Sequence, residues 1–177
     1  MRPARRGGQR LLGWVLFFVW AVSLSGLQAL VWRDAASAFV PDAALVLAVV
    51  VLARAEASDL VPLAFLTACA RAATSGEAPL VLVTGALGAL FAALLLRGVL
   101  ELSGALGRTI AALVAVFSFE AWIVLARGAR AGAATLDAAG AAASAIPIAL
   151  ASALAALLLG PLLARLPGLT PLWSRSW

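Results

Sequence analysis

The apolar runs of this chain contain few side chains that could do chemistry, and Glu120 is the most prominent of them. It lies near the middle of the run at residues 109–126. A carboxylate at membrane depth is costly, so it is a functional-site candidate by default. The functional interpretations are a proton relay, a ligand contact or a polar contact with a partner helix. The structural interpretation is a protonated Glu120 hydrogen-bonded to Ser118, Thr84 or another helix, and the sequence leaves both open.

A second acidic residue, Asp42, follows Pro41 at the start of another apolar run. Proline suits the first turn of a helix, and an acidic group there interacts favourably with the positive end of the helix dipole. Helix initiation therefore explains this pair without a further role. Ser75, Gly76 and Glu77 are interpreted as the turn that follows the third apolar run.

The chain lacks the side chains that most catalytic sites need. It has no histidine, the commonest general base and metal ligand, and its one cysteine, Cys69, excludes an internal disulfide or a cysteine-cluster metal site. Intramembrane serine and zinc proteases need histidine. An aspartyl protease needs two membrane aspartates, and Asp34 and Asp42 both lie at the outer boundary. Catalysis is therefore not expected, and no catalytic, cofactor-binding or metal-binding residue is assigned.

The composition is that of a membrane protein. Of the 177 residues, 64% are hydrophobic and only 12% are charged, and the mean hydropathy is +1.08. A soluble domain is about half apolar and about a quarter charged, and a chain of this size has no core that could hide so many apolar side chains. The arginines form no basic stripe, which argues against a nucleic-acid partner.

Six apolar runs form a single expected transmembrane domain at residues 11–165, between a basic N-terminal segment at 1–10 and a short tail at 166–177. The first run is too long for the core of a secretory signal and long enough to cross a hydrocarbon core of about 30 Å. The expected fold class is an all-α integral membrane protein of about six transmembrane helices, two of them short. The runs are residues 11–32, 40–53, 60–73, 80–96, 109–126 and 140–164.

The second and third runs are short, and runs of this length are often re-entrant rather than spanning. A re-entrant hairpin would carry Arg54, Glu56 and Asp59 into the membrane at its tip. Each ionised group there costs at least about 2.5 kcal/mol. Two short crossings, with these charges at the far surface, are therefore favoured.

Arginine asymmetry sets the expected orientation. With the N-terminus in the cytoplasm, the inner segments hold more arginines than the outer ones, which favours a bacterial inner membrane protein with both termini cytoplasmic. The inner set is Arg2, Arg5, Arg6, Arg10, Arg54, Arg97, Arg108, Arg165 and Arg175, and the outer set is Arg33, Arg71, Arg127 and Arg130.

Small residues at four-residue spacing let membrane helices approach closely. Gly85 and Ala89 have this spacing in the fourth run, and the third and sixth runs have it too. We expect helix contacts on these faces, and Pro147 is expected to kink the last helix. The further small residues are Ala64, Ala68 and Ala72 in the third run and, in the sixth, Gly140, Ser144, Ser152, Ala156 and Gly160 with the adjoining Ala141, Ala145, Ala149 and Ala153.

The order of these features resembles the MreD family, the small integral membrane proteins of the bacterial rod-shape machinery, or elongasome. The resemblance covers roughly residues 11–165. In the family's third segment, which usually reads Gly-Phe-x-x-Gly-x-x-x-Asp-x-x-Ser-Gly, this chain has alanine at both glycines and Ala72 at the aspartate. The residues that carry the resemblance are Pro41, Asp42, Phe65, Ser75, Gly76 and Glu120.

The resemblance implies a non-enzymatic scaffold that binds an MreC-like protein and, through it, the cell-wall synthases. It also implies a helical arrangement similar to the substrate-binding subunits of energy-coupling-factor transporters. Such a subunit, for a vitamin or a metal, is the alternative function. It needs an outward pocket lined by polar and aromatic groups, and the outer segments here are poor in them. Apart from the lipid bilayer, no small-molecule ligand is expected.

Overall fold

The computed structural model describes residues 3–31, 39–132 and 137–173, and these contain six α-helices, two short 3₁₀ helices and no strand. Arg2, Arg33, Asp34 and Arg175, on which part of the expected orientation rests, lie outside the described residues. The helices are α1 (Pro3–Val31), α2 (Ala43–Leu52), η1 (Ala57–Asp59), α3 (Leu60–Ala72), α4 (Pro79–Leu96), α5 (Ala105–Arg130), α6 (Ala138–Leu163) and η2 (Thr170–Leu172).

Each α-helix overlaps one of the six apolar runs, and local signals explain where several of them begin. Pro79 occupies the first turn of α4, where its missing N–H has no intrahelical partner in any case. The Asp137 carboxylate accepts the Gly140 backbone N–H and so caps α6. α1 begins at Pro3, within the basic segment, so Arg5, Arg6 and Arg10 belong to the helix rather than preceding it.

Four helices are long and apolar enough to cross a membrane: α1 from Gly8, α4, α5 and α6. The described chain is therefore that of a multi-pass membrane protein. α2 is different, because its ten residues extend only about 15 Å at 1.5 Å per residue. That is about half of a bilayer core, so the full count of crossings stays a prediction.

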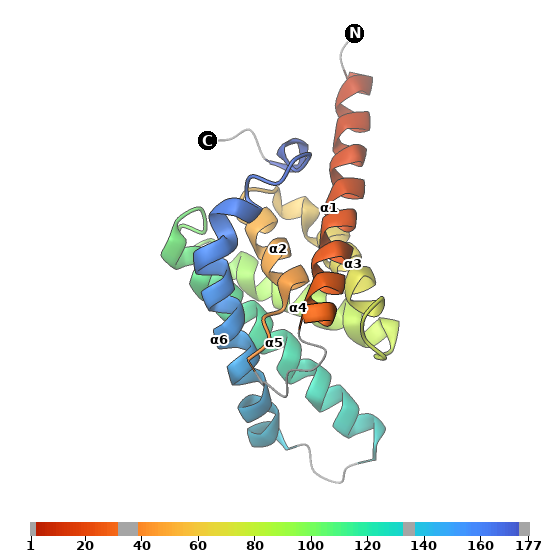
Figure 1. Cartoon of the computed structure of the whole chain (residues 1–177), viewed down its shortest axis with the longest axis vertical. Coiled ribbons are helices and arrows are strands. Elements are labelled where there is room, and N and C mark those ends of the chain that lie inside the picture. The colour runs from red at the N-terminus through yellow and green to blue at the C-terminus, as the bar shows by residue number, and fades with distance from the viewer. Residues whose placement is uncertain (1–2, 32–38, 133–136, 174–177) are drawn as a thin grey trace.

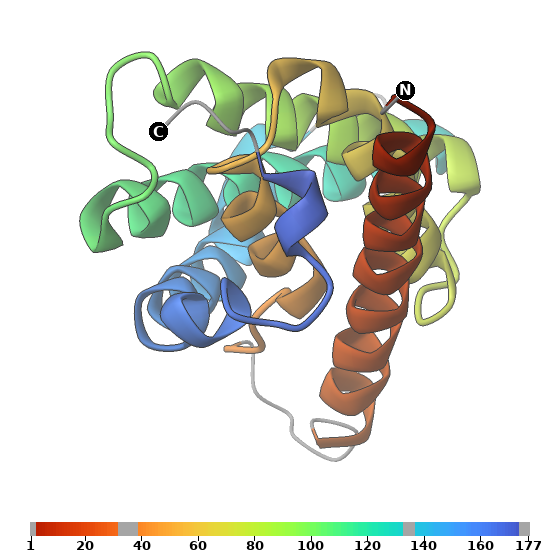
Figure 2. The same cartoon turned by 90° about the horizontal axis from the view of Figure 1, so that it is seen from above.

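α2 is the centre of the molecule. Residues 44–52 are all buried, and α2 packs against α1, α3, α4, α5 and α6. A helix that is apolar on every side requires such an environment, and α2 carries Ala, Leu and Val alone. In both views α2 lies between α1 on one side and α6 on the other (Figures 1 and 2).

The turn between α2 and α3 is held at the end of the bundle where α1 begins and α6 ends (Figure 1). Arg10 donates to Asp59 at 2.6 Å and to Glu56 at 3.3 Å. Arg97, at the end of α4, donates to the Ala55 carbonyl at 2.6 Å. The Glu56 and Asp59 carboxylates of this turn are therefore paired within the protein, and their burial would cost less than that of isolated ions.

The small-residue faces predicted from the sequence do form helix contacts. Gly85 of α4 lies against Phe119 and Trp122 of α5, and Ala89 is buried. Ala64 and Ala68 of α3 are buried as well, whereas Ala72 is exposed. Along α6 the buried residues are Ala141, Ala145, Ala149, Ser152, Ala153, Ala156 and Gly160, whereas Ser144 is exposed.

Candidate functional site

Two acidic residues predicted as site candidates meet at one arginine inside the bundle. The Arg71 guanidinium lies with its Nε 3.2 Å from Asp42 Oδ2 and its Nη2 3.0 Å from Glu120 Oε1. Asp42 precedes α2, Arg71 lies in the last turn of α3, and Glu120 lies on α5. The three side chains are 1%, 17% and 13% exposed. We name Asp42, Arg71 and Glu120 the ion cluster.

Asp42 is fixed by its backbone as well as by its side chain. Its Oδ1 accepts the Leu45 N–H at 3.0 Å, so it caps α2 as the sequence predicted. Its own N–H donates to the Ser152 hydroxyl of α6 at 2.8 Å, and the next N–H, of Ala43, donates to Gln28 of α1 at 3.0 Å. The start of α2 is thereby tied to α1, α3 and α6, and this goes beyond the helix-initiation role.

Two carboxylates and one aromatic ring contact the Arg71 guanidinium. Its Cζ lies 5.4 Å from the centre of the Phe119 ring, a cation–π distance. The Nη2 contact with Glu120 is a hydrogen bond. The contact with Asp42 is an ion pair without hydrogen-bond alignment, because neither Arg71 Nε nor Asp42 Oδ2 has a hydrogen-bond partner among the described residues.

With both carboxylates ionised, the ion cluster has two negative groups and one positive group. A buried cation and anion repay their desolvation only when geometry is good, but removal of one partner leaves an uncompensated charge and is strongly destabilising. The cluster therefore joins α2, α3 and α5 in one arrangement. Among the described residues no group of His, Cys, Asp and Glu could hold a metal ion.

The other candidate residues lie elsewhere. Phe65, on α3, is 53% exposed, and Gly76 is exposed in the turn after α3. Ser75 lies in the same turn; its N–H donates to the Arg71 carbonyl at 2.9 Å, and its hydroxyl is buried without a partner. The residues carried by the resemblance therefore do not form one site.

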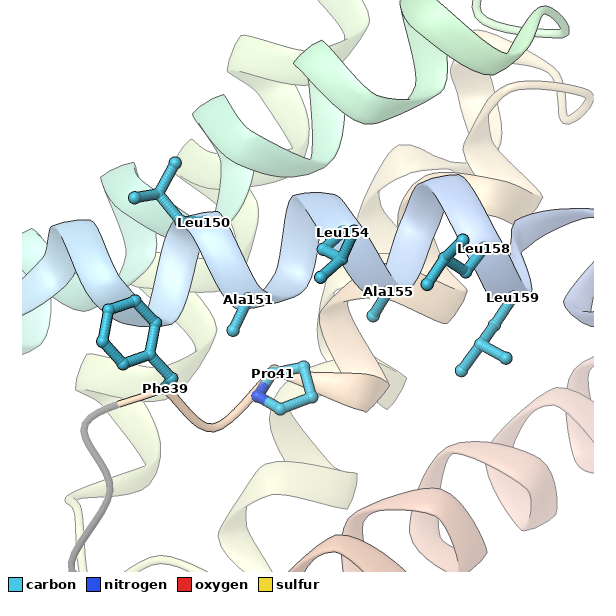
Figure 3. Close-up of a pocket in the computed structure, with 8 residues that line it drawn as sticks. All are labelled: Phe39, Pro41, Leu150, Ala151, Leu154, Ala155, Leu158 and Leu159. Atoms are coloured by element: carbon cyan, nitrogen blue, oxygen red, sulfur yellow. The ribbon is translucent and has the colours of Figure 1, made fainter.

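Pro41 instead lines an apolar groove against α6 (Figure 3). Phe39 and Pro41 face the α6 side chains at residues 150–159 across a volume of about 460 Å³. The groove is lined almost entirely by carbon, with Leu150, Leu154 and Leu158 among its side chains. Its surroundings are therefore suited to a hydrocarbon rather than to a polar substrate.

From the sequence, Arg71 and Arg97, both at run ends, were expected to reach Glu120 only if helix packing allowed it, and Arg71 was not selected as the centre of the site. Sequence reasoning missed Gln28 and Ser152 as further partners of the α2 start. Arg71, Gln28 and Ser152 are polar residues within apolar runs. Such residues face the bundle interior as a rule, so this rule, applied to every run, would have selected them. Arg97, also considered as a partner of Glu120, bonds to the Leu52 and Ala55 carbonyls instead.

The fold and the ion cluster define a multi-pass all-α membrane protein built around a short buried helix. Comparison of the chain with protein-family models, with curated proteins and with solved structures finds no match. The assignment of a function therefore depends on the chain's own residues.

Proposed function

We propose that this protein is a non-enzymatic scaffold of the bacterial elongasome, resembling MreD. In this role it takes part in cell-shape control and peptidoglycan synthesis by binding an MreC-like protein and the wall synthases. It is an inner membrane protein with both termini in the cytoplasm.

The observation that best supports the proposal is the convergence of Asp42 and Glu120 on Arg71. These two acidic residues are 78 positions apart in the sequence, and both are carried by the resemblance. A cluster that fixes α2, α3 and α5 relative to one another would hold a partner-binding surface in one shape. A scaffold needs such rigidity but no catalytic group.

Affinity capture of the tagged protein from native membranes tests the proposal. We expect an MreC-like protein and wall synthases to be recovered with it. Recovery of a transporter ATPase pair in their place would contradict the proposal and favour the alternative, a substrate-binding subunit of an energy-coupling-factor transporter.

Glu120→Ala sharpens this test. The substitution leaves Arg71 with Asp42 alone, so we expect weaker partner recovery with little change in membrane insertion. The matched control is Glu101→Ala, which removes an exposed carboxylate outside the helices. Capture yield, normalised to the amount of inserted protein, is the measurement. Equal yields for Glu120→Ala and the wild type would show that the ion cluster does not contribute to partner binding.

A further inference from the structure

A polar cavity lies beside the ion cluster. It has a volume of about 240 Å³ and is lined by Ser25, Gln28, Arg71 and Thr74, with Ala29 and Val40 completing the wall. Four of its six lining residues are polar, although two of them belong to the apolar helix α1. Apolar surroundings make such groups costly unless they have partners.

Three of the four polar side chains that line this cavity, those of Ser25, Gln28 and Arg71, have unused donors, whereas the Thr74 hydroxyl donates to the Arg71 carbonyl. Ser25 is only 4% exposed, and its hydroxyl has no hydrogen-bond partner among the described residues. The Gln28 Oε1 atom accepts the Ala43 N–H, which leaves the amide nitrogen of Gln28 for the cavity. Arg71 donates from Nη2 to Glu120, and its Nε forms an ion pair with Asp42 without a hydrogen bond. Nη1 makes no contact of either kind within the described residues. An occupant should therefore present acceptor oxygens.

The charge of the surroundings restricts that occupant. Asp42 and Glu120 already supply two carboxylates to Arg71, so the ion cluster carries no spare positive charge. An additional anion would be repelled. The acceptor oxygens should therefore belong to a molecule without net charge.

Shared lining residues link the polar cavity to an apolar cavity and, through it, to the groove of Figure 3. Gln28 also lines a second cavity, of about 250 Å³, between α1 and α6. Pro41, Ala155 and Leu159 line both this second cavity and the groove of Figure 3. The polar cavity therefore shares a lining residue with an apolar cavity, which in turn shares three lining residues with the apolar groove along α6.

This sequence of cavities points to a bound membrane lipid of zero net charge. Its glycerol ester oxygens accept hydrogen bonds from Ser25, Gln28 and Arg71, and one acyl chain lies between α1 and α6 and along α6. A water-soluble ligand would leave the apolar path unused, and a purely hydrocarbon occupant would leave the buried donors unpaired. The inference does not depend on the proposed function, because it concerns the isolated chain.

Native mass spectrometry of the full-length protein tests this inference. The protein is reconstituted in vesicles of equimolar phosphatidylethanolamine and phosphatidylglycerol and then released in detergent. We expect one phosphatidylethanolamine to be retained in preference to phosphatidylglycerol. Absence of retained lipid, or equal retention of the two lipids, would overturn the inference.

Two pairs of variants locate the lipid. Ser25→Leu fills the polar cavity and removes a donor, whereas Ser23→Leu changes an exposed residue of the same helix. We expect Ser25→Leu to lower retention at least about tenfold relative to its control, the effect of losing one or two hydrogen bonds. Equal retention by the two variants would overturn the assignment.

Ala155→Trp keeps the inference testable if Ser25→Leu does not fold. Ala155 lines both apolar cavities but not the polar one, so tryptophan there obstructs the acyl chain. Its control is Leu157→Trp, at an exposed position of α6. We expect retention to fall for Ala155→Trp alone, and retention equal to that of the control would contradict the acyl-chain path.

Discussion

Arg71 holds together parts of the molecule that are distant in sequence, because it is the only cation in contact with Asp42 and Glu120 among the described residues. Loss of either carboxylate leaves Arg71 paired with the other, but loss of Arg71 leaves both carboxylates without this ion pair. The arginine should therefore contribute more to stability than either acid.

Arg71→Gln should lower the free energy of unfolding by about 3–5 kcal/mol, the usual cost of leaving buried charge uncompensated. Glu120→Gln should cost less, because Asp42 keeps its ion pair. The measurement is denaturant unfolding in detergent micelles. Arg165→Gln, at an exposed position, is the control and should stay within about 0.5 kcal/mol of the wild type. Equal stability of the two arginine variants would mean that the ion cluster is not structural.

Glu77 gives a prediction about pH. Hydrogen bonds from Arg127 and then Arg130 hold the pKa of its carboxyl below the ordinary value of 4.5. A lowered folded-state pKa adds stability at neutral pH, and this stability is lost as the pH falls from about 4.5 through the folded-state pKa.

Glu77→Gln removes this contribution, so its melting temperature should lie below that of the wild type at neutral pH. The difference should shrink as the pH falls below 4.5. Glu101→Gln serves as the control for loss of an exposed carboxylate. A difference that does not depend on pH would show that the two arginine contacts contribute nothing through ionisation.

The sequence predicted the residue roles that depend on neighbours along the chain. Asp42 caps α2 because capping needs only an acceptor two or three residues before a free N–H. The partner of Glu120 was not predictable in the same way, because it depends on how α3 packs against α5. Arg71 lies near a run end, and a long side chain at such a position can reach water or the interior equally well.

At the scale of the helix pair, α4 and α5 depend on one glycine. A Cβ atom at Gly85 would lie 2.7 Å from Trp122 Cδ1 and 3.1 Å from Phe119 Cδ2. Trp122 cannot move freely, because its indole N–H donates to the Val81 carbonyl of α4 at 3.1 Å.

Gly85→Leu should therefore destabilise the bundle by about 1–3 kcal/mol or more, the cost of overpacking. Gly88→Leu, on the exposed face of the same helix with no atom within 4 Å of a Cβ, should have little effect. Thermal melting of both variants in detergent compares them. A stable Gly85→Leu variant would mean that α4 and α5 can separate without loss.

The bounds of α3, α4 and α6 were predicted to within two residues, since apolar runs, prolines and caps are local signals. α1 instead begins eight residues before its predicted run, and α5 extends four residues beyond its run at each end. The third run was expected at residues 60–73, and α3 spans Leu60–Ala72. The enclosure of α2 was not predicted, because a short apolar run has the same composition whether it crosses a bilayer or lies inside a protein. The two environments differ in whether other helices surround the run, and a local sequence pattern does not report this.

At the scale of the whole molecule, the expected orientation can be tested with single cysteines in a Cys69→Ala background. Ser58 lies in the exposed turn between α2 and α3, and Gly76 lies in the exposed turn after α3. We expect an impermeant thiol reagent to label Gly76→Cys in intact cells and Ser58→Cys only after permeabilisation. The reverse pattern would invert the topology, and labelling of both would place both turns outside.

The enclosure of α2 also has a consequence for how the protein is made. Ten residues cannot anchor a helix across the bilayer on their own, and four of the five helices that surround α2 are synthesised after it. While the chain is still on the ribosome, α2 lacks most of the helices that pack around it in the native molecule. The packing around α2 is therefore complete only after α6 has been synthesised and has packed against α2.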